Sequence, residues 1–528
     1  MRRLSLLLAA LVSALLLAAP YHFTNVWPVA FIAFVPLFFT FRERSPSQLF
    51  KVCFIFGLMY HALLGYWLNY VNVLGFLVLT AYLSVFFGLF GAFSNAFFFS
   101  NKMRSAAYVA AIWVCLEYAR GFLLSGFPWA LLSYTQWKNL PFIQAADIVG
   151  AHGISFVVLW ANVIAYRVLR SRLPTSRAGA NQTAALRGDP RPLRTALTLA
   201  IVLGAFWGYG LWRLYAREAF YLSEGPKALL KVSVVQGNIP QEEKWDSKIK
   251  NIIFEKYKRL TLMAAMEEPD LIVWPETSFP GYLEDEPVMA AHLRGLVRQA
   301  GTRLLVGAPT LGDLEKSLRF YNTAVLFASN GEELGRYSKV HLVPFGEYVP
   351  FEPLLGFIRH FVPIGHFSPG PEQTIFSIVT ENQKIKIAAK FGVLICYEDI
   401  FPGLVRQLCL DGADFLVNIT NDAWFGKSSA PYQHAQASVF RAIENRVPVV
   451  RSTNTGFSCF ISAEGRVTSS VKKDGQEIMV SGHQTQDLVL RKGRPFFTRF
   501  GDAFFWLVVG ILIFAVKERH KNSGYSRI

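Results

Sequence analysis

Long apolar runs dominate the chain up to residue 214 and recur once near its end. A helix that crosses a bilayer needs roughly 20 consecutive, mainly apolar residues. Eight runs come close to this length, so we predict a bundle of about eight membrane-spanning helices. The predicted spans lie at about residues 4–20, 25–41, 52–70, 74–99, 105–123, 152–169, 195–214 and 500–516.

The first of these runs has a second interpretation. It follows Arg2 and Arg3 and ends in Ala18, Ala19 and Pro20, as a cleaved signal peptide would. Another apolar run begins a few residues later, which is the pattern of a helical hairpin in a multispanning protein. We therefore favour a helix that is retained.

The pattern changes between residues 215 and 499, where short β-branched runs alternate with amphipathic stretches. Strands that alternate with helices are typical of a layered α/β domain. We predict a transmembrane domain at 1–214, an extracytoplasmic catalytic domain at 215–499, and a last transmembrane helix with a cytoplasmic tail at 500–528. The expected strands are 231–236, 271–274, 304–307, 323–327, 387–395, 415–419, 449–451 and 456–462, and the expected helices are 248–267, 287–300, 402–411 and 432–445.

Composition and charge agree with this division. Hydrophobic residues make up 52% of the chain and charged residues only 17%, which excludes a protein that is soluble throughout. The net charge of +16 would suit a nucleic-acid partner if the basic residues formed one surface, but most of them flank apolar runs. Residues 167–194, for example, hold seven arginines against the single acid Asp189. Because short basic loops stay in the cytoplasm, we expect both termini there, the catalytic domain on the opposite side, and no nucleic-acid partner.

Three short motifs place a reactive side chain at or just after a predicted strand. Ligand sites of α/β sheets lie beyond the carboxyl ends of strands, where Glu276 and Cys396 are expected. Taken singly, Glu276 could cap a helix, Lys339 could be a surface charge, and Cys396 could be a small buried apolar residue. The motifs are DLIVWPET at 270–277, YSKVHLVPFGEYVP at 337–350 and FGVLICYED at 391–399.

In this order along the chain, VWPET, YSKVHLVPFGEYVP and GVLICYED resemble the motifs of the apolipoprotein N-acyltransferases, the membrane-bound branch of the nitrilase superfamily. The likeness covers essentially the whole chain, including the eight-span plan. It implies that residues 215–499 form a nitrilase-like αββα sandwich attached to the helical bundle. It also implies that Glu276 is the general base, Lys339 the cation that stabilises the oxyanion, and Cys396 the nucleophile.

Physical chemistry supports these three roles. A free thiol has a pKa of roughly 8.5 and attacks as the thiolate, so a carboxylate that accepts its proton is useful. A fixed ammonium, with backbone N–H donors, stabilises the charge that develops on the acyl oxygen. The ammonium would lower the pKa of the thiol and the carboxylate would raise it, and the sequence does not decide between them.

Further residues take lesser roles. The resemblance implies that Glu347, Tyr397 and Glu398 are also needed, and we interpret them as groups that orient Lys339 and neutralise its charge; a helix cap or a surface position is the alternative. In the family-like stretch VQGNIPQEEKW (235–245), Trp245 is expected either to contact lipid or peptide or to anchor the domain. The residues expected to hold loops and helices in place are Asn322, Asn421, Asp422, Arg441 and Glu444.

The resemblance supplies the substrates. The donor would be a membrane glycerophospholipid, and the acceptor the free amino group of the diacylglyceryl-cysteine that begins an apolipoprotein. The enzyme would act through an S-acyl-cysteine in the inner membrane of a bacterium, with its catalytic domain in the periplasm. We expect a monomer without metal or organic cofactor. Of Cys396, Cys409 and Cys459, one pair could form a disulfide, and we expect Cys396 to remain free.

Two other functions fit parts of the sequence. A membrane-tethered hydrolase of the nitrilase type would use the same three residues with water as the acceptor. A transporter with an inactive appended domain would carry ionisable residues inside its spans, for which Glu117 and Arg120 are the main candidates. We favour the acyltransferase, because a small polar substrate does not need a chamber in the bilayer.

Overall fold

A computed structural model describes most of the chain. The described residues fall into two compact units, one formed by Met1–Asn69, Val73–Phe220 and Phe500–Ile528, the other by Tyr70–Asn72 and Tyr221–Arg499. Trp245 and residues 173–190 of the basic loop lie outside the described residues. The structure describes residues 2–23, 25–100, 104–172, 191–223, 229–244, 246, 248–314, 317–350, 352–357, 365–382, 385–490 and 493–524.

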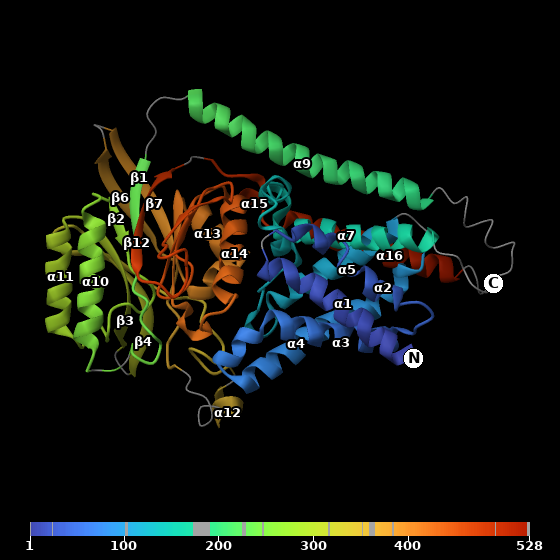
Figure 1. The fold of residues 1–528 in the computed structure, drawn as a ribbon, viewed down its shortest axis with the longest axis horizontal. Coiled ribbons are helices and arrows are strands. Elements are labelled where there is room, and N and C mark those ends of the chain that lie inside the picture. Colours follow the sequence, from blue (N-terminus) through green and yellow to red (C-terminus); the bar gives the residue numbers. More distant parts are fainter. Residues whose placement is uncertain are drawn as a thin grey trace. The chain divides into compact units, whose positions relative to one another are not determined.

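The first unit is a helical bundle (Figure 1). Five of its described helices are long and apolar enough to cross a membrane, at Leu4–His22, Pro46–Leu64, Val73–Phe98, Ala146–Arg172 and Arg194–Tyr215. Of the other predicted spans, 25–41 contains a shorter apolar stretch at Trp27–Phe39, and the helix of the span at 105–123 has 17 residues. The helices are α1 (Arg2–His22), α2 (Val35–Phe39), α3 (Pro46–Leu64), α4 (Val73–Phe98), α5 (Arg104–Arg120), α6 (Leu140–Ile143), α7 (Ala146–Arg172), α9 (Arg191–Ser223) and α16 (Ala503–Gly524), with 3₁₀ turns η1 (Trp27–Phe31), η2 (Tyr66–Tyr70), η3 (Leu123–Ser125) and η4 (Leu132–Gln136).

The second predicted span, at 25–41, is not one continuous helix. It forms the short turn η1 and the short helix α2, each with a proline in its first turn. Proline lacks the N–H that a continuous helix needs, so the break leaves backbone groups to be satisfied by other helices. Asn162 of α7 does so by accepting from the Phe34 N–H (2.8 Å) and donating to the Ala30 carbonyl (2.8 Å). The sequence pattern missed this break.

Trp113 of α5 is the centre of the bundle's aromatic core. The rings of Phe34, Phe87 and Phe90 meet it edge to face, with centroids 5.2, 5.0 and 5.2 Å away. Such T-shaped pairs contribute about 0.5–1.5 kcal/mol beyond their buried area. Phe34 directly precedes α2, Phe87 and Phe90 lie on α4, and Trp113 lies on α5. The aromatic core therefore holds these three segments together.

Glu117 and Arg120, the ionisable residues expected inside the spans, both bond to the chain that follows α5. A carboxylate oxygen of Glu117 accepts from the Leu132 N–H (2.7 Å), and the Arg120 guanidinium donates to the Trp129 carbonyl (3.1 Å). Buried irregular backbone needs such partners. These contacts give both residues a structural part in the bundle.

The second unit contains two six-stranded sheets. In each, three parallel strands form the middle and antiparallel strands complete the edges. The first sheet has the order β12-β1-β2-β3-β4-β5, from β1 (Leu229–Gln236), β2 (Leu271–Val273), β3 (Arg303–Leu314), β4 (Ser317–Phe327), β5 (Glu333–Ser338) and β12 (Gly482–Val489); the second has the order β11-β10-β9-β8-β7-β6, from β6 (Ile375–Asn382), β7 (Ile385–Ile395), β8 (Phe415–Thr420), β9 (Val449–Thr453), β10 (Cys459–Ile461) and β11 (Val467–Ser470).

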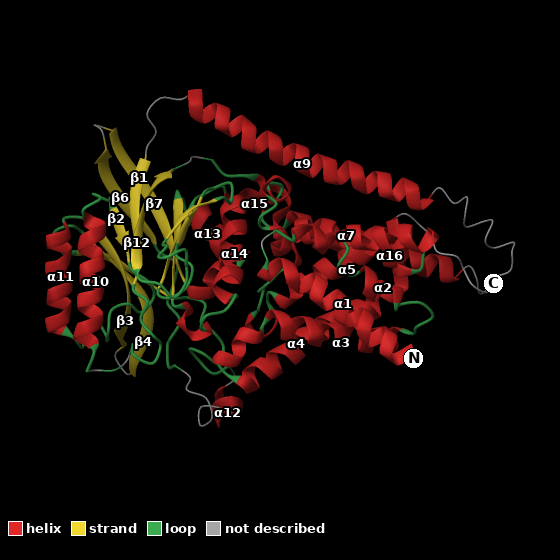
Figure 2. Cartoon of the chain, viewed as in Figure 1, coloured by secondary structure: helices red, strands yellow, loops and turns green. Residues whose placement is uncertain are grey.

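The two sheets pack face to face, and helices cover their outer faces (Figure 2). Val232 and Val273 of the first sheet share one apolar core with Val393 and Val417 of the second. Helices α10 (Lys250–Ala265) and α11 (Pro287–Ala300) cover the first sheet, while α13 (Pro402–Leu410) and α14 (Ala430–Asn445) cover the second. The predicted class, a helical bundle with an αββα sandwich, is confirmed.

Sequence reasoning found the buried parallel strands and missed four edge strands. The short apolar runs predict β1, β2, β7, β8 and β9 to within a few residues, because a strand covered on both faces is apolar throughout. The edge strands β5, β6, β11 and β12 are antiparallel and largely polar, so they lack this signal.

Candidate active site

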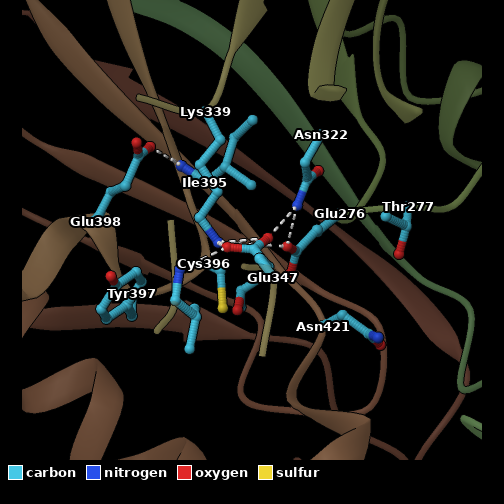
Figure 3. Close-up of polar contacts among 12 residues, drawn as sticks. Glu276, Thr277, Asn322, Lys339, Glu347, Ile395, Cys396, Tyr397, Glu398 and Asn421 are labelled. Atoms are coloured by element: carbon cyan, nitrogen blue, oxygen red, sulfur yellow. Dashed lines mark hydrogen bonds and ion pairs between the residues drawn. The ribbon is translucent and has the colours of Figure 1, made fainter. Parts of the chain in front are cut away.

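Strand ends from both sheets deliver the predicted reactive residues to one place. β2 ends at Val273 and is followed by Glu276, while β7 ends at Ile395 and is followed directly by Cys396. Lys339 follows β5, and its backbone N–H donates to the Asn322 carbonyl of β4 (2.8 Å). Figure 3 shows Glu276, Lys339 and the Cys396 sulfur side by side. Residues that lie 120 positions apart in sequence therefore form one cluster.

The backbone at two points of this cluster adopts the left-handed conformation. Thr277, directly after Glu276, has φ 46°, and Cys396 itself has φ 56°. This region is unfavourable for residues with a side chain, and particularly so for a β-branched one such as threonine. Strain of about 1–3 kcal/mol per residue persists only where the surroundings enforce it, and it gathers at functional sites.

Lys339 is buried against two carboxylates. Its side chain is 1% exposed, and its ammonium lies 2.8 Å from one Glu347 oxygen and 3.0 Å from the other. A Glu276 oxygen is 3.9 Å away. A second Glu347 contact, from the Val343 N–H (2.8 Å), fixes that carboxylate. Lys339 is thus an immobile cation held between the expected base and a second acid.

Asn322 joins the two carboxylates. Its side-chain amide donates to Glu276 (2.7 Å) and to Glu347 (3.1 Å). The sequence analysis expected Asn322 only to hold a loop, because a single asparagine in a strand carries no signal of this kind. The amide instead sets the distance between the two acids and orients the oxygen of Glu276.

The electrostatics of the cluster favour a neutral thiol at rest. Burial raises the pKa of Cys396 well above its usual value, the Glu276 carboxylate raises it further, and Lys339 opposes both. Burial likewise raises the pKa of Glu276, against the opposing effect of Lys339. Burial alone would lower the pKa of Lys339, but Glu347, Cys396 and Glu276 outweigh it and raise that pKa. The question that the sequence left open is therefore decided in favour of a thiol that needs a base.

Glu398 organises the turn that carries Cys396. Its carboxylate is fully buried and accepts from the Ile395 N–H (2.7 Å), the Val340 N–H (2.9 Å) and the Tyr337 hydroxyl (2.9 Å), with a further bond from His341 N–H. Burial raises the pKa of Glu398 to about 7, while Lys339 and these donors oppose the shift. Glu398 ties the strand before Cys396 to the segment that carries Lys339.

Tyr397 covers the cation. Its ring lies 5.3 Å from the Lys339 ammonium, within the range of a cation–π contact, and its hydroxyl donates to the Leu342 carbonyl. Like Glu347 and Glu398, it therefore touches Lys339 or the segment around it. The structure brings these three predicted residues together with the central three.

A buried charged network supports the 3₁₀ turn η6 (Cys396–Ile400) from behind. His434 of α14 lies 2.8 Å from an Asp399 oxygen and 3.3 Å from an Asp422 oxygen, and Arg451 lies 2.6 Å from Asp399. In addition, Arg441 pairs with Glu444 (2.8 Å), as expected of residues that hold helices in place. The network fixes Asp399, three residues after the nucleophile.

Other predicted residues have structural surroundings. Asn421 accepts from the Asn454 side chain (2.9 Å) and donates to Gln241 (2.7 Å), which joins two loops.

All five cysteines are free thiols, and Cys396 is partly exposed whereas Cys409 and Cys459 are buried. Within the described ranges, no group of three or more His, Cys, Asp or Glu side chains is arranged to hold a metal ion.

Lys244 is a functional candidate that sequence reasoning missed. It is 5% exposed, and its ammonium donates to the Glu276 carbonyl (3.1 Å) and to the Thr277 hydroxyl (2.7 Å). In the sequence it follows Glu242 and Glu243, so it reads as one of several surface charges. The only available signal was its place in the family-like stretch beside Trp245.

Comparison with known proteins identifies the class of both units. Residues 231–489 match the carbon-nitrogen hydrolase family, which defines the sandwich as a nitrilase-type catalytic domain. Residues 13–164 match the apolipoprotein N-acyltransferase N-terminal domain. A solved amidase from Nesterenkonia sp. covers 52% of this chain and 94% of its own, with a TM-score of 0.37 and 19% identity, so the assignment rests on the sequence matches.

Full-length relatives then narrow the class to one family. The apolipoprotein N-acyltransferase of Geobacter metallireducens is 38% identical over 97% of this chain and 96% of its own length. That of Haemophilus influenzae is 32% identical over 87% of this chain and 85% of its own. The chain belongs to the apolipoprotein N-acyltransferase family, and with its apolar helices it is a membrane protein.

We predict that Gly307→Ala impairs the site without unfolding the domain. A methyl group on this β3 residue would collide with the Pro275 carbonyl and lie 2.7 Å from the Glu276 Cα, so the expected base must move. A displacement of this size can lower a catalytic rate by about a hundredfold. The rate of Cys396 acylation by phospholipid would measure it. Gly403→Ala is the control, because nothing lies within 4 Å of that position, and equal rates in both variants would contradict the prediction.

We also predict that stability falls at alkaline pH through His434. Burial lowers the pKa of His434, but Asp399 and Asp422 outweigh it and raise that pKa to about 9 from an ordinary 6.5. A raised pKa stabilises the fold fully below about pH 6.5, and this stabilisation is lost as the pH rises through about 9. Melting temperatures of the purified protein across this range would show the loss.

The matched comparison uses His434→Asn and His292→Asn. The first should lower the melting temperature at neutral pH and flatten its pH dependence, since the titrating group is gone. The second changes an exposed histidine and should leave the profile as it is in the wild type. A His434→Asn profile parallel to the wild type would refute the assignment.

Proposed function

We propose that this enzyme transfers a fatty acyl group from a membrane glycerophospholipid to the amino terminus of diacylglyceryl-modified apolipoproteins, with Cys396 as the nucleophile. The observation that carries the proposal is the buried cluster of Glu276, Lys339 and Cys396 in a chain of this family. The family name supports a lipoprotein acceptor and a lipid donor. The cluster supports a thioester route between them.

In the first step Glu276 accepts the Cys396 proton, and the thiolate attacks the ester carbonyl of the phospholipid. A raised pKa makes the Glu276 carboxylate a stronger base, which suits its role as acceptor of the proton from a thiol whose own pKa is raised. Lys339, fixed between carboxylates, stabilises the oxyanion. The C–O bond then breaks, and the lysophospholipid leaves with the proton from Glu276.

In the second step the amino group of the acceptor attacks the thioester. Glu276 takes the proton of the amine, the C–S bond breaks, and the thiol of Cys396 is restored. A thioester reacts with amines more readily than an oxygen ester does, which makes the two-step route reasonable. Glu347 would hold Lys339 in place through both steps, Tyr397 and Glu398 would orient the segment around it, and Trp245 would contact lipid or peptide.

The helical unit suits substrates that do not leave the bilayer. Each buried CH₂ of an acyl chain contributes about 0.8 kcal/mol, so both lipid substrates stay in the membrane. We propose that residues 1–214 and 500–528 form the membrane part, with both termini cytoplasmic, and that residues 215–499 act at the periplasmic side of the inner membrane. We further propose that the enzyme works as a monomer.

The proposed chemistry predicts a covalent intermediate. Incubation with phospholipid should add one acyl group to the intact mass of the wild type and none to Cys396→Ala, since the thiol is the only group expected to carry it. Adding a diacylglyceryl-cysteine peptide should discharge the acyl group onto the peptide. Intact-mass spectrometry of enzyme and peptide measures both steps.

Two outcomes would overturn this function. If Cys396→Ala were acylated as well, Cys396 would not be the nucleophile. If the acyl group left the wild type only as free fatty acid and never appeared on the peptide amine, the tethered hydrolase would replace the transferase. Cys409→Ala is the control variant, because Cys409 is a buried thiol in the same domain.

The proposed orientation predicts opposite labelling of two exposed positions. In a Cys396→Ala background, a membrane-impermeant maleimide applied to intact spheroplasts should label Leu334→Cys on β5, where the native side chain is 50% exposed. Glu43→Cys, at a position whose side chain is 79% exposed, should be labelled only after permeabilisation. The reverse pattern would invert the assigned topology.

A further inference from the structure

Lys244 occupies an unusual position for a lysine. Its side chain is buried, and its ammonium donates to the Glu276 carbonyl and the Thr277 hydroxyl. Burying an ammonium costs several kcal/mol unless nearby groups compensate for it. Among the described residues, Glu276 opposes this cost electrostatically, and Cys396 does so in its thiolate form; these are the two partners of the proposed proton transfer.

Lys244 bonds to the most strained point of the site. Thr277 has φ 46°, a conformation that a β-branched residue adopts only when its surroundings enforce it. Lys244 donates to the Glu276 carbonyl, which directly precedes Thr277, and to the hydroxyl of Thr277 itself. The two hydrogen bonds therefore hold the backbone and the side chain at the strained residue. Gly307 approaches the same backbone from β3, so Glu276 is clamped from two directions.

The segment that carries Lys244 is itself anchored to the loops around the site. The Asn238 N–H donates to the Asn454 carbonyl (2.7 Å), and the Ile239 N–H donates to the Asn454 side chain (2.9 Å). Gln241 accepts from Asn421 (2.7 Å). The segment therefore runs from β1 across the ends of β8 and β9 before Lys244 reaches Glu276.

We propose that Lys244 is a positioning residue for the acyl transfer: it fixes the backbone at Glu276 and Thr277, and its charge keeps the Glu276 carboxylate ionised and ready to accept the Cys396 proton. This inference rests on the proposed function, since it assigns Glu276 the role of base. It adds a second cation next to Glu276, besides Lys339, to which the proposed mechanism gives the oxyanion.

The surrounding charges set the direction of the effect. Burial raises the pKa of Glu276, and Lys339 and Lys244 lower it while Glu347 raises it. At the Cys396 thiol, burial and Glu276 raise the pKa, Lys339 and a hydrogen bond with Thr420 lower it, and Asp422 raises it. Burial lowers the pKa of Lys244 itself to about 7, so the lysine is charged on the acid side of neutrality, where ionisation of Glu276 limits the reaction.

The test compares Lys244→Met and Lys244→Gln with Lys244→Arg. The two neutral variants should move the acid limb of the pH profile for acyl-enzyme formation to higher pH by about one unit, which is about a tenfold slower reaction on that limb. Lys244→Arg keeps the charge and should stay within about threefold of the wild type. Lys256→Met is the control, because Lys256 also donates to this segment, at the Asn238 carbonyl (3.3 Å), without touching Glu276.

A second readout does not depend on lipid transfer. Alkylation of Cys396 by iodoacetamide, followed by peptide mass spectrometry, also requires transfer of the thiol proton to Glu276, and at about pH 6 it should slow several-fold in the neutral variants only. If the wild type formed no acyl-enzyme, the proposed function would fail while this readout still tested Lys244. Neutral variants that melt earlier but keep both wild-type pH profiles would overturn the inference, leaving Lys244 a purely structural anchor.

Discussion

The site depends on burying the Lys339 ammonium among carboxylates in one closed space. An isolated buried cation is strongly unfavourable, so Glu347 and Glu276 must lie where the structure places them, 2.8 and 3.9 Å from the ammonium. Glu276 follows β2, Lys339 follows β5, and Glu347 lies in the loop beyond Lys339. The register of the first sheet therefore decides whether the carboxylates meet the Lys339 ammonium. Only with its charge compensated in this way can Lys339 be held ready for the proposed oxyanion.

The same charges determine whether the Cys396 thiol is protonated before the reaction begins. Burial and Glu276 together outweigh Lys339 at the Cys396 thiol, so the thiol rests neutral. A neutral thiol in a partly exposed position is protected from unwanted oxidation, which follows the thiolate. Activation then requires a base whose own pKa is raised, and the buried Glu276 meets that requirement.

Around the reacting groups, many polar side chains bond to the backbone or to one another and so hold the site in place. Glu398 accepts four donors beneath the Cys396 turn, His434 bridges Asp399 and Asp422, and Asn322 spaces the two acids. Each of these side chains is buried and held by hydrogen bonds or ion pairs, so it rigidifies the site. The helical unit repeats the principle, since Asn162 satisfies the break before α2 and Glu117 that after α5.

The sequence by itself predicted the division of the chain and the three central residues of the proposed site, and it located the buried parallel strands, because apolar runs and local motifs carry that information without a fold. It missed the polar edge strands and the proline break at 25–41, where neighbouring elements compensate for what local pattern lacks. The tertiary structure alone decided which acids lie against Lys339, the electrostatic surroundings of the thiol, and the contacts that Asn322 and Lys244 make with Glu276. These depend on distances across the sheets, which a linear pattern of residue types does not encode.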